Sequence, residues 1–293
     1  DIKLMCRLVK GAYWDSEIKR AQEMGMPHYP VFTHKHHTDV SYLACAKALL
    51  DAPDAIYPQF ATHNAATIAA ILQMAAKTGA TFELQRLHGM GEGVYREVLK
   101  NPLIACRVYA PVGAHRDLLA YLVRRLLENG ANSSFVHQLT DESVGMNELL
   151  ISPLRLEPHS AFALPPKLFG EHPKARQNSS GVDLTVETMR APLLAAYQTA
   201  VVPNVAEYAV AAIPEALKTS IASYKIWSKT AVTERAAILR NAADALDSQL
   251  PHFCALLVKE AFKTWGDAVS EVREAVDFLR YYADEAERIM API

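Results

Sequence analysis

Four short hydrophobic runs, each followed by glycine or polar residues, stand out in the first 138 positions of the chain. They cover residues 4–9, 56–61, 82–87 and 106–112, and they are rich in Val, Ile, Phe and Tyr. Continuous apolar runs of this length are typical of parallel strands that are buried on both faces. We therefore predict four parallel β-strands in this part of the chain.

Helical patterns fill the intervals between these predicted strands. Residues 64–77 carry an apolar stripe at helical spacing and are followed by Gly79, which suits a C-cap, and residues 117–129 repeat the arrangement before Gly130. His88 follows His63 by 25 residues, and Gly113 follows His88 by another 25. One strand, one loop and one helix occupy about this length, so the spacing indicates a repeated βα unit.

This alternation predicts an α/β fold, either a barrel or a doubly wound sheet. No GxGxxG follows the first strand, which weakens the dinucleotide-binding alternative. The polar residues collect after the strands, where a (βα)8 barrel places its active site, although only four of eight strands are present. The 52 residues between Gly11 and His63 indicate either two units or one unit with an insertion around residues 25–38.

The pattern changes after residue 138. Residues 139–192 contain Pro153, Pro158, Pro165, Pro166 and Pro173, together with the sequence Asn178-Ser179-Ser180-Gly181, which predict an extended connector. From residue 193 onwards, amphipathic helices are expected over 206–223, 234–246 with Thr233 as N-cap, and 269–282. The domain prediction is thus a barrel part over 1–138, a connector over 139–192, and the start of a second domain over 193–293.

Composition narrows the class of protein. Thirty Lys and Arg residues against 32 Asp and Glu leave no basic surplus, so nucleic-acid binding is not expected for this segment. The four cysteines are far apart, which argues against a disulfide scaffold or a zinc finger. No stretch is long and apolar enough for a membrane span, and no signal peptide opens the chain, which suggests a soluble, intracellular protein. Because it begins at Asp1 with a strand already in progress, we expect a segment of a longer protein.

Two adjacent arginines mark the helix predicted over 117–129. Arg124 and Arg125 lie about 100° apart on a helix that is otherwise almost entirely apolar, so at least one is expected to point into a site. A guanidinium fork is a natural receptor for a small carboxylate, and Glu128 is spaced to orient either arginine. A surface ion-pair cluster is the alternative.

Several residues near the strand ends are further candidates. His63 and His88 occupy equivalent places in successive units, which favours a ligand-binding rim over two structural hydrogen bonds. Arg7, Lys10 and Lys35 offer cations for a phosphorylated cofactor, with solvated charge as the alternative. Tyr13 and Trp14 are suited to stacking on a planar ring or to simple packing. The sequence His34-Lys35-His36-His37 lacks metal-ligand spacing, so no metal site is predicted.

Five motifs of the first 138 residues, taken in order, resemble the proline dehydrogenase domain of the bacterial proline utilisation A family. They are residues 7–15, RLVKGAYWD; 59–64, QFATHN; 87–91, LHGMG; 107–113, RVYAPVG; and 121–132, YLVRRLLENGAN. The resemblance implies a distorted (βα)8 barrel that holds FAD, of which this chain would contain the second half.

It also implies roles for individual residues. Arg124 and Arg125 would bind the proline carboxylate, and Tyr109, Leu87 and Tyr13 would wall the proline ring. Arg7 would sit beside the flavin and, with Tyr109, join the arginine pair in catalysis. The cofactor would be lined by a further set: Val9, Gly11, Ala12, Trp14, Thr62, His63, Asn64, Gln85 and Tyr109. Thr33 and Lys35 would approach its phosphate and adenosine portion. Arg86 stands where the family often has cysteine.

Residues 183–293 resemble the linker and first helices of the fused glutamate-semialdehyde dehydrogenase module, a member of the aldehyde dehydrogenase superfamily. The resemblance rests on residues 224–228, 234–240, 260–264 and 271–282. In the third of these segments, Phe262 replaces a glycine that is usual in the module. The NAD site and the nucleophilic cysteine of that module would lie outside this chain. The resemblance further implies L-proline as substrate, a membrane quinone as electron acceptor, a homo-oligomer, and a cytoplasmic protein with peripheral association at the inner membrane. A non-catalytic structural or interaction fragment remains the alternative.

Overall fold

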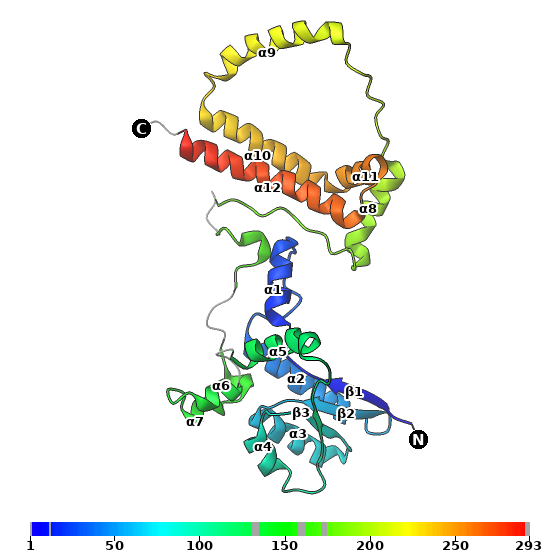
Figure 1. Cartoon of the computed structure of the whole chain (residues 1–293), viewed down its shortest axis with the longest axis vertical. Coiled ribbons are helices and arrows are strands. Elements are labelled where there is room, and N and C mark those ends of the chain that lie inside the picture. The colour runs from blue at the N-terminus through cyan, green and yellow to red at the C-terminus, as the bar shows by residue number, and fades with distance from the viewer. Residues whose placement is uncertain (1, 12, 131–134, 158–161, 171–174, 291–293) are drawn as a thin grey trace. The chain divides into compact units, whose positions relative to one another are not determined.

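The computed structural model describes residues 2–11, 13–130, 135–157, 162–170 and 175–290. They fall into two compact units (Figure 1). The first unit is drawn from Asp1–Asp15 and Val31–Phe162, and the second from Ser16–Pro30 and Ala163–Ile293. Each unit therefore contains a segment from the N-terminal third of the chain.

A four-stranded parallel sheet forms the centre of the first unit. Its strands are β1 (Leu4–Leu8), β2 (Ile56–Ala61), β3 (Glu83–Leu87) and β4 (Ala105–Tyr109), in the order β1-β2-β3-β4. All four predicted strands are confirmed. The last one ends earlier than expected, two residues before Pro111, which has no N–H to donate to a neighbouring strand.

Helices cover one face of this sheet. They include α2 (Lys35–Leu50), α3 (Ala65–Thr78) and α4 (Glu92–Val98), which precedes β4. Phe60 and Leu84 from the sheet pack with Ile68, Ile71 and Leu50 from the helices, and all five side chains are fully buried. Each contributes about 1.5–3 kcal/mol of hydrophobic stabilisation. The apolar core lies on the helical side, so the opposite face of the sheet is left to carry polar groups.

The long interval between the first two strands is one βα unit with an insertion. β1 pairs directly with β2, and Arg7 lies opposite Gln59 in the parallel register. Between these strands the chain forms α1 (Trp14–Glu23) and then α2. The inserted stretch Ser16–Pro30 belongs to the second unit. Direct pairing of β1 with β2 excludes an additional strand between them in this sheet.

The predicted ends of the helix over 64–77 are confirmed by its caps. Asn64 precedes α3, and its side-chain oxygen accepts a hydrogen bond from the Thr67 amide at 2.9 Å. Gly79 ends the helix with φ of 70°, a left-handed conformation that glycine adopts without steric cost. The helix predicted over 117–129 is also present, as α5 (His115–Gly130), and it includes the glycine that we expected to follow it.

Short helical turns interrupt the region predicted as an extended connector. They are α6 (Phe135–Thr140), α7 (Met146–Leu149), η1 (Pro153–Arg155) and η2 (Pro165–Lys167). Both 3₁₀ turns have proline in their first turn, where its missing N–H costs no hydrogen bond. The longer helix α8 (Glu187–Thr199) then opens the helical part of the second unit.

The remaining elements of the second unit are helical: η3 (Val210–Ala212), α9 (Ile213–Trp227), α10 (Val232–Ser248), α11 (Leu250–Ala261) and α12 (Trp265–Ile289). Figure 1 shows α10 and α12 lying side by side in opposite directions. Ala236, Ala243, Val276 and Ala283 are fully buried, and these small side chains let the two helices approach closely. Arg240 of α10 pairs with Asp284 and Glu287 of α12 across this seam.

Two helix starts differ from the prediction. The helix expected from residue 206 begins at Ile213, since residues 203–209 are not helical. Thr233 is not an N-cap, because Val232 is already helical and Ala231 holds the cap position. Thr264 is a true N-cap, and it accepts a hydrogen bond from the Asp267 amide at the start of α12. None of the described helices has the length and apolar character needed to cross a bilayer.

Candidate functional site

The face of the sheet opposite the helices carries most of the strand residues predicted to serve the site. Side chains alternate between the two faces of a strand, so Arg7, Gln85, Leu87 and Tyr109 all lie on this face. Gln85 is paired in register with Arg107, and Leu87 with Tyr109. Gln85 and Leu87 are buried, whereas Arg7 is exposed. The fold therefore brings together candidates that are about 100 residues apart in sequence.

A hydrogen-bond chain joins three of these residues. The Arg7 Nε donates to Oε1 of Gln85 at 2.8 Å, and a terminal nitrogen of Arg7 donates to the Tyr109 hydroxyl at 3.0 Å. The Arg7 guanidinium carbon also lies 5.4 Å from the centroid of the Tyr109 ring. These contacts hold a permanent positive charge in a defined orientation on the open face of the sheet.

Glu83 extends this chain into the interior of the unit. Its Oε1 accepts hydrogen bonds from Gln85 Nε2 at 2.7 Å, Gln59 Nε2 at 2.9 Å and Arg107 Nε at 2.8 Å. A second nitrogen of Arg107 donates to its Oε2 at 3.0 Å. The hydrogen bonds from Arg107 are the main reason that the pKa of Glu83 lies below its ordinary value. Glu83 is therefore a buried, ionised carboxylate.

The loop after β2 supports the same region through backbone contacts. Nε2 of His63 accepts a hydrogen bond from the Leu87 amide at 3.2 Å, so this nitrogen is unprotonated. Burial, aided by the charge of Arg86, lowers the pKa of His63. The Tyr95 hydroxyl donates to the carbonyl oxygens of Thr62 and Gln85, at 2.7 and 3.1 Å. Thr62 is buried and its hydroxyl oxygen accepts from the Asn64 amide.

A second cluster of charge follows β1. Nζ of Lys10 lies 2.5 Å from Oδ1 of Asp39, and Nζ of Lys35 lies 2.7 Å from Oδ2 of the same carboxylate. Burial by itself raises the pKa of Asp39, but the two lysines outweigh this effect and hold the pKa below its usual range. Burial also lowers the pKa of Lys10. Lys35, predicted to approach a phosphate, is thus held in place by Asp39 from the same helix.

The other predicted residues of this loop are less enclosed. Val9 and Tyr13 are exposed, and Thr33 is half-buried. Gly11 has φ of 87°, and a Cβ placed on it would meet no atom within 4 Å. Nε1 of Trp14 donates to the Phe32 carbonyl at 2.8 Å, and its ring packs edge-on against Phe162. Ala12 lies outside the described residues.

Arg124 and Arg125 both lie on α5, which packs on α6. Arg124 is exposed, and the guanidinium carbon of Arg125 lies 5.5 Å from the Tyr121 ring centroid. Leu126 and Leu127 on this helix are also exposed, at 72% and 69%. The argument that an apolar, buried helix must aim an arginine into a site is therefore weakened, and the carboxylate role of this pair stays a prediction.

Arg86 and the histidine cluster do not join the site. Arg86 lies on the helical side of β3, where it donates to the Met90 carbonyl at 3.0 Å and so braces the turn after the strand. The rings of His34, His36 and His37 lie 4.3–5.6 Å apart. Among the described residues, no group of three or more His, Cys, Asp or Glu side chains is placed to hold a metal ion.

Sequence reasoning missed Glu83, Asp39 and Tyr95. Glu83 and Gln85 are two residues apart in a run that we interpreted as uniformly apolar, and this alternation was the available signal for a polar strand face. Asp39 lies four residues after Lys35 on one helix, a spacing that favours an ion pair. Tyr95 carries no local signal, because its role depends on contacts with two strand ends.

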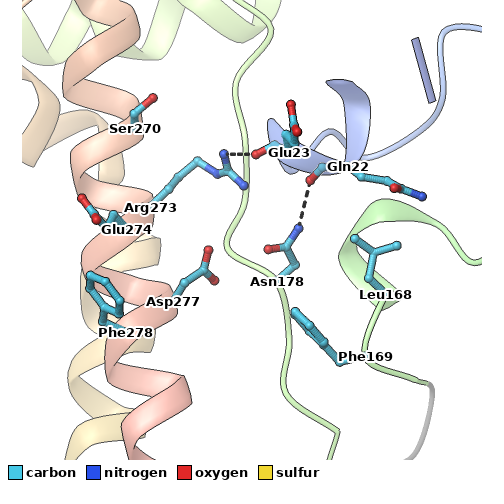
Figure 2. Close-up of a pocket in the computed structure, with 10 residues that line it drawn as sticks. All are labelled: Gln22, Glu23, Leu168, Phe169, Asn178, Ser270, Arg273, Glu274, Asp277 and Phe278. Atoms are coloured by element: carbon cyan, nitrogen blue, oxygen red, sulfur yellow. Dashed lines mark hydrogen bonds between the residues drawn. The ribbon is translucent and has the colours of Figure 1, made fainter. Parts of the chain in front are cut away.

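A hollow lies within the second unit (Figure 2). It has a volume of about 620 Å³ and is lined by residues that include Gln22, Asn178, Arg273 and Asp277. Figure 2 shows Arg273 donating to the Glu23 carbonyl and Asn178 to the Gln22 carbonyl. The contact of Arg273 fastens the inserted segment to α12, and that of Asn178 fastens it to the connector. None of the predicted site residues lines this hollow.

Comparison with known proteins supports the predicted resemblance. The proline dehydrogenase family model matches residues 1–138, and the model of the aldehyde dehydrogenase family matches residues 186–293. Bifunctional protein PutA of Escherichia coli (strain K12) is 46% identical over 97% of this chain, and that of Klebsiella aerogenes is 45% identical over the same share. The chain is thus similar to a segment of the proline utilisation A proteins. The predicted resemblance is thereby confirmed.

Solved structures of proline utilisation A agree with this assignment. A crystal structure of a bifunctional proline utilization A (PutA) protein superimposes with a TM-score of 0.88 at 48% identity, over 99% of this chain and 30% of that one. A Bradyrhizobium japonicum PutA mutant gives 0.86 at 49% identity, over 98% of this chain and 29% of that one. The predicted fold class, part of a (βα)8 barrel followed by helices of an aldehyde-dehydrogenase-like domain, is confirmed. The chain spans about a quarter of the length of the curated relatives it matches.

Proposed function

We propose that residues 1–138 contribute half of the site at which a proline utilisation A protein oxidises L-proline to pyrroline-5-carboxylate with FAD. When bound, FAD supplies at N5 the acceptor for the hydride that leaves C5 of proline. The observation that carries the proposal is the open sheet face on which Gln85 and Tyr109 hold the Arg7 guanidinium. The match of residues 1–138 to the proline dehydrogenase family model supports the same reaction class.

The residues present fit a flavin. Arg7 offers donors with a fixed orientation, and a Cβ on either Gly11 or Gly89 would meet no atom within 4 Å, which leaves room for close approach by a ring system. Lys35 is fixed by Asp39 and offers a cation for a phosphate. In this proposal the cofactor is held by the following residues: Arg7, Val9, Gly11, Ala12, Trp14, Thr33, Lys35, Thr62, His63, Asn64, Gln85 and Tyr109.

The protein's part in the reaction is to orient the substrate. Arg124 and Arg125 bind the proline carboxylate, and Tyr109, Leu87 and Tyr13 wall the ring. Bidentate binding of the carboxylate fixes which ring carbon faces the cofactor. Because His63 stays neutral near pH 7 and accepts a backbone hydrogen bond, it serves as a positioning group and not as a proton donor.

The proposal extends to the second enzyme module, to its NAD and to the electron acceptor. The helices after residue 186 begin a module that oxidises glutamate semialdehyde to glutamate with NAD, at a site outside this chain. A membrane quinone would accept the electrons that bound flavin takes up, which would require peripheral membrane association of the homo-oligomer. A non-catalytic fragment is the alternative, and it predicts neither flavin binding nor proline oxidation.

The test replaces Arg125 by Met in a full-length protein that carries this segment, for instance the E. coli relative with residues 1–293 exchanged in. Loss of a charge-assisted pair is expected to raise KM for proline about 10- to 100-fold, with FAD content unchanged. Arg116→Met on the same helix is the control, since Arg116 is exposed and lies beside Asp117. An unchanged KM in Arg125→Met, or an equal rise in the control, would contradict the carboxylate role.

A further inference from the structure

We propose that Glu83 is a positioning residue, which sets the orientation of the Gln85 side-chain amide and, through it, the orientation of Arg7. The inference concerns a buried carboxylate that the proposed reaction does not itself use, and its relevance to catalysis rests on the proposed function. A series of hydrogen bonds across β1, β3 and β4 joins Glu83 to Gln85, Gln85 to Arg7, and Arg7 to Tyr109.

The first step concerns the amide of Gln85. A carboxylate only accepts hydrogen bonds, so the group of Gln85 that lies 2.7 Å from Glu83 must be its NH2. The amide oxygen then faces the other way, towards Arg7, where it accepts from Nε at 2.8 Å. Arg7 has donors and no acceptors, so it requires an oxygen at this point. Ionised Glu83 therefore selects the only amide orientation that Arg7 tolerates.

The second step concerns how firmly Glu83 itself is held. It is 4% exposed, and Gln59 and Arg107 donate to it from the strands on either side. The hydrogen bonds from Arg107 keep its pKa below the ordinary value, so it remains ionised near pH 7. Four hydrogen bonds to two oxygens leave the carboxylate little freedom to rotate.

The third step concerns Arg7 and Tyr109, at the exposed end of this series of hydrogen bonds. With Nε engaged by Gln85, the plane of the Arg7 guanidinium is fixed, and a terminal nitrogen reaches the Tyr109 hydroxyl at 3.0 Å. Arg7 and Tyr109 are both among the residues proposed to contact the cofactor, and Tyr109 is also proposed to wall the proline ring. Glu83 thus acts on the site through Gln85, without contact of its own with Arg7.

An apolar side chain in place of Glu83 removes this selection, whereas an amide keeps it. Oε1 of Glu83 accepts from Gln85, Gln59 and Arg107 Nε, and Oε2 accepts only from a terminal nitrogen of Arg107. In Glu83→Gln the new oxygen therefore takes the place of Oε1, the new NH2 faces Arg107, and Gln85 keeps its orientation. In Glu83→Met the NH2 of Gln85 has no acceptor, so the amide is free to turn and Arg7 loses its fixed acceptor.

The test measures hydrogen exchange of the Arg7 Nε–H by ¹⁵N NMR on the 293-residue chain, with the signal assigned from Arg7→Lys. Glu83→Met is expected to speed exchange about tenfold, as befits loss of one charge-assisted hydrogen bond. Gln59→Met is the matched control, because Gln59 donates to the same oxygen but has no part in the line to Arg7. Its exchange rate should equal that of the unmodified chain.

Glu83→Gln is the conservative variant, and slow exchange is expected to be retained in it because its amide oxygen still accepts from the NH2 of Gln85. Unchanged exchange in Glu83→Met, equal acceleration in Gln59→Met, or fast exchange in Glu83→Gln would overturn the inference. This readout needs no flavin, so it separates the inference from the proposed function. In the full-length protein, Glu83→Met is also expected to shift the reduction potential of bound flavin, whereas Gln59→Met is not.

Discussion

Phe262 ends α11 in a left-handed conformation, with φ of 54° and ψ of 31°. It is the only residue other than glycine with positive φ in the described part of the chain. The amides of Phe262 and Lys263 both point back to the Leu257 carbonyl, so the chain must turn here to end the helix. The glycine that the resemblance implies at this position would suit this turn, because a residue without Cβ adopts it freely. We therefore predict that Phe262→Gly stabilises the second unit.

The magnitude follows from three contributions. Relief of the left-handed conformation yields about 1–2 kcal/mol. The greater freedom of glycine in the unfolded chain costs about 0.4–1 kcal/mol. The Phe262 side chain is 88% exposed, so its removal costs almost no burial. The expected net gain is about 0.5–1 kcal/mol, or about 2–3 °C in Tm for a unit of this size.

Urea unfolding followed by helical circular dichroism measures this gain, with the free energy of unfolding taken from the transition of the second unit. Phe262→Ala is the matched control: it removes the ring but keeps a Cβ in the strained conformation, so it should match the unmodified chain. If Phe262→Gly is no more stable than Phe262→Ala, the strain argument is wrong. If both variants are less stable than the unmodified chain, the ring contributes packing that its exposure does not indicate.

Two further predictions concern other positions. A Cβ on Gly181 would lie 1.7 Å from the Met24 carbonyl oxygen, so Gly181→Ala should destabilise the second unit by about 2–3 kcal/mol in urea unfolding. Gly145→Ala is the control and should not destabilise the protein, because a Cβ there would meet no atom within 4 Å. Equal stability of the two variants would refute the close approach at Gly181. Burial and the charge of Arg86 lower the pKa of His63 from 6.5, so the contribution of His63 to stability is complete above about pH 6.5 and is lost as the pH falls through the folded-state pKa. His63→Gln should lack this part of the pH dependence when urea midpoints are measured between about pH 5 and 8. An identical pH dependence in the variant and the unmodified chain would contradict this prediction.

The main elements of the first unit could be predicted because local sequence dictates them. The apolar runs at residues 56–61 and 82–87 form strands, and Asn64 and Gly79 supply the chemistry that starts and ends a helix. The end of α11 was not predictable in this way, since nothing in the sequence around Phe262 marks a left-handed residue. Strand order was resolved only by the structure, because the interval between Gly11 and His63 allowed two arrangements.

The candidate site could be predicted in part for the same reason. The family resemblance pointed to Gln85 and Tyr109, Arg7 was also a candidate as a cation near a strand end, and the structure joins the three by hydrogen bonds. Glu83 escaped notice because its importance comes from partners on neighbouring strands, which are 24 residues away in both directions. The place of Arg124 and Arg125 depends on tertiary contacts that a helical pattern does not encode.

The central claim is that this chain contributes to a flavin site that oxidises proline, and one spectrum tests it most directly. A purified full-length protein that carries residues 1–293 is expected to show the absorption band of oxidised flavin at about 450 nm. Addition of L-proline without oxygen should bleach this band, and Arg125→Met should need far more proline for the same bleaching. A protein that is folded but colourless, or a flavin band that proline leaves unchanged, would contradict the account.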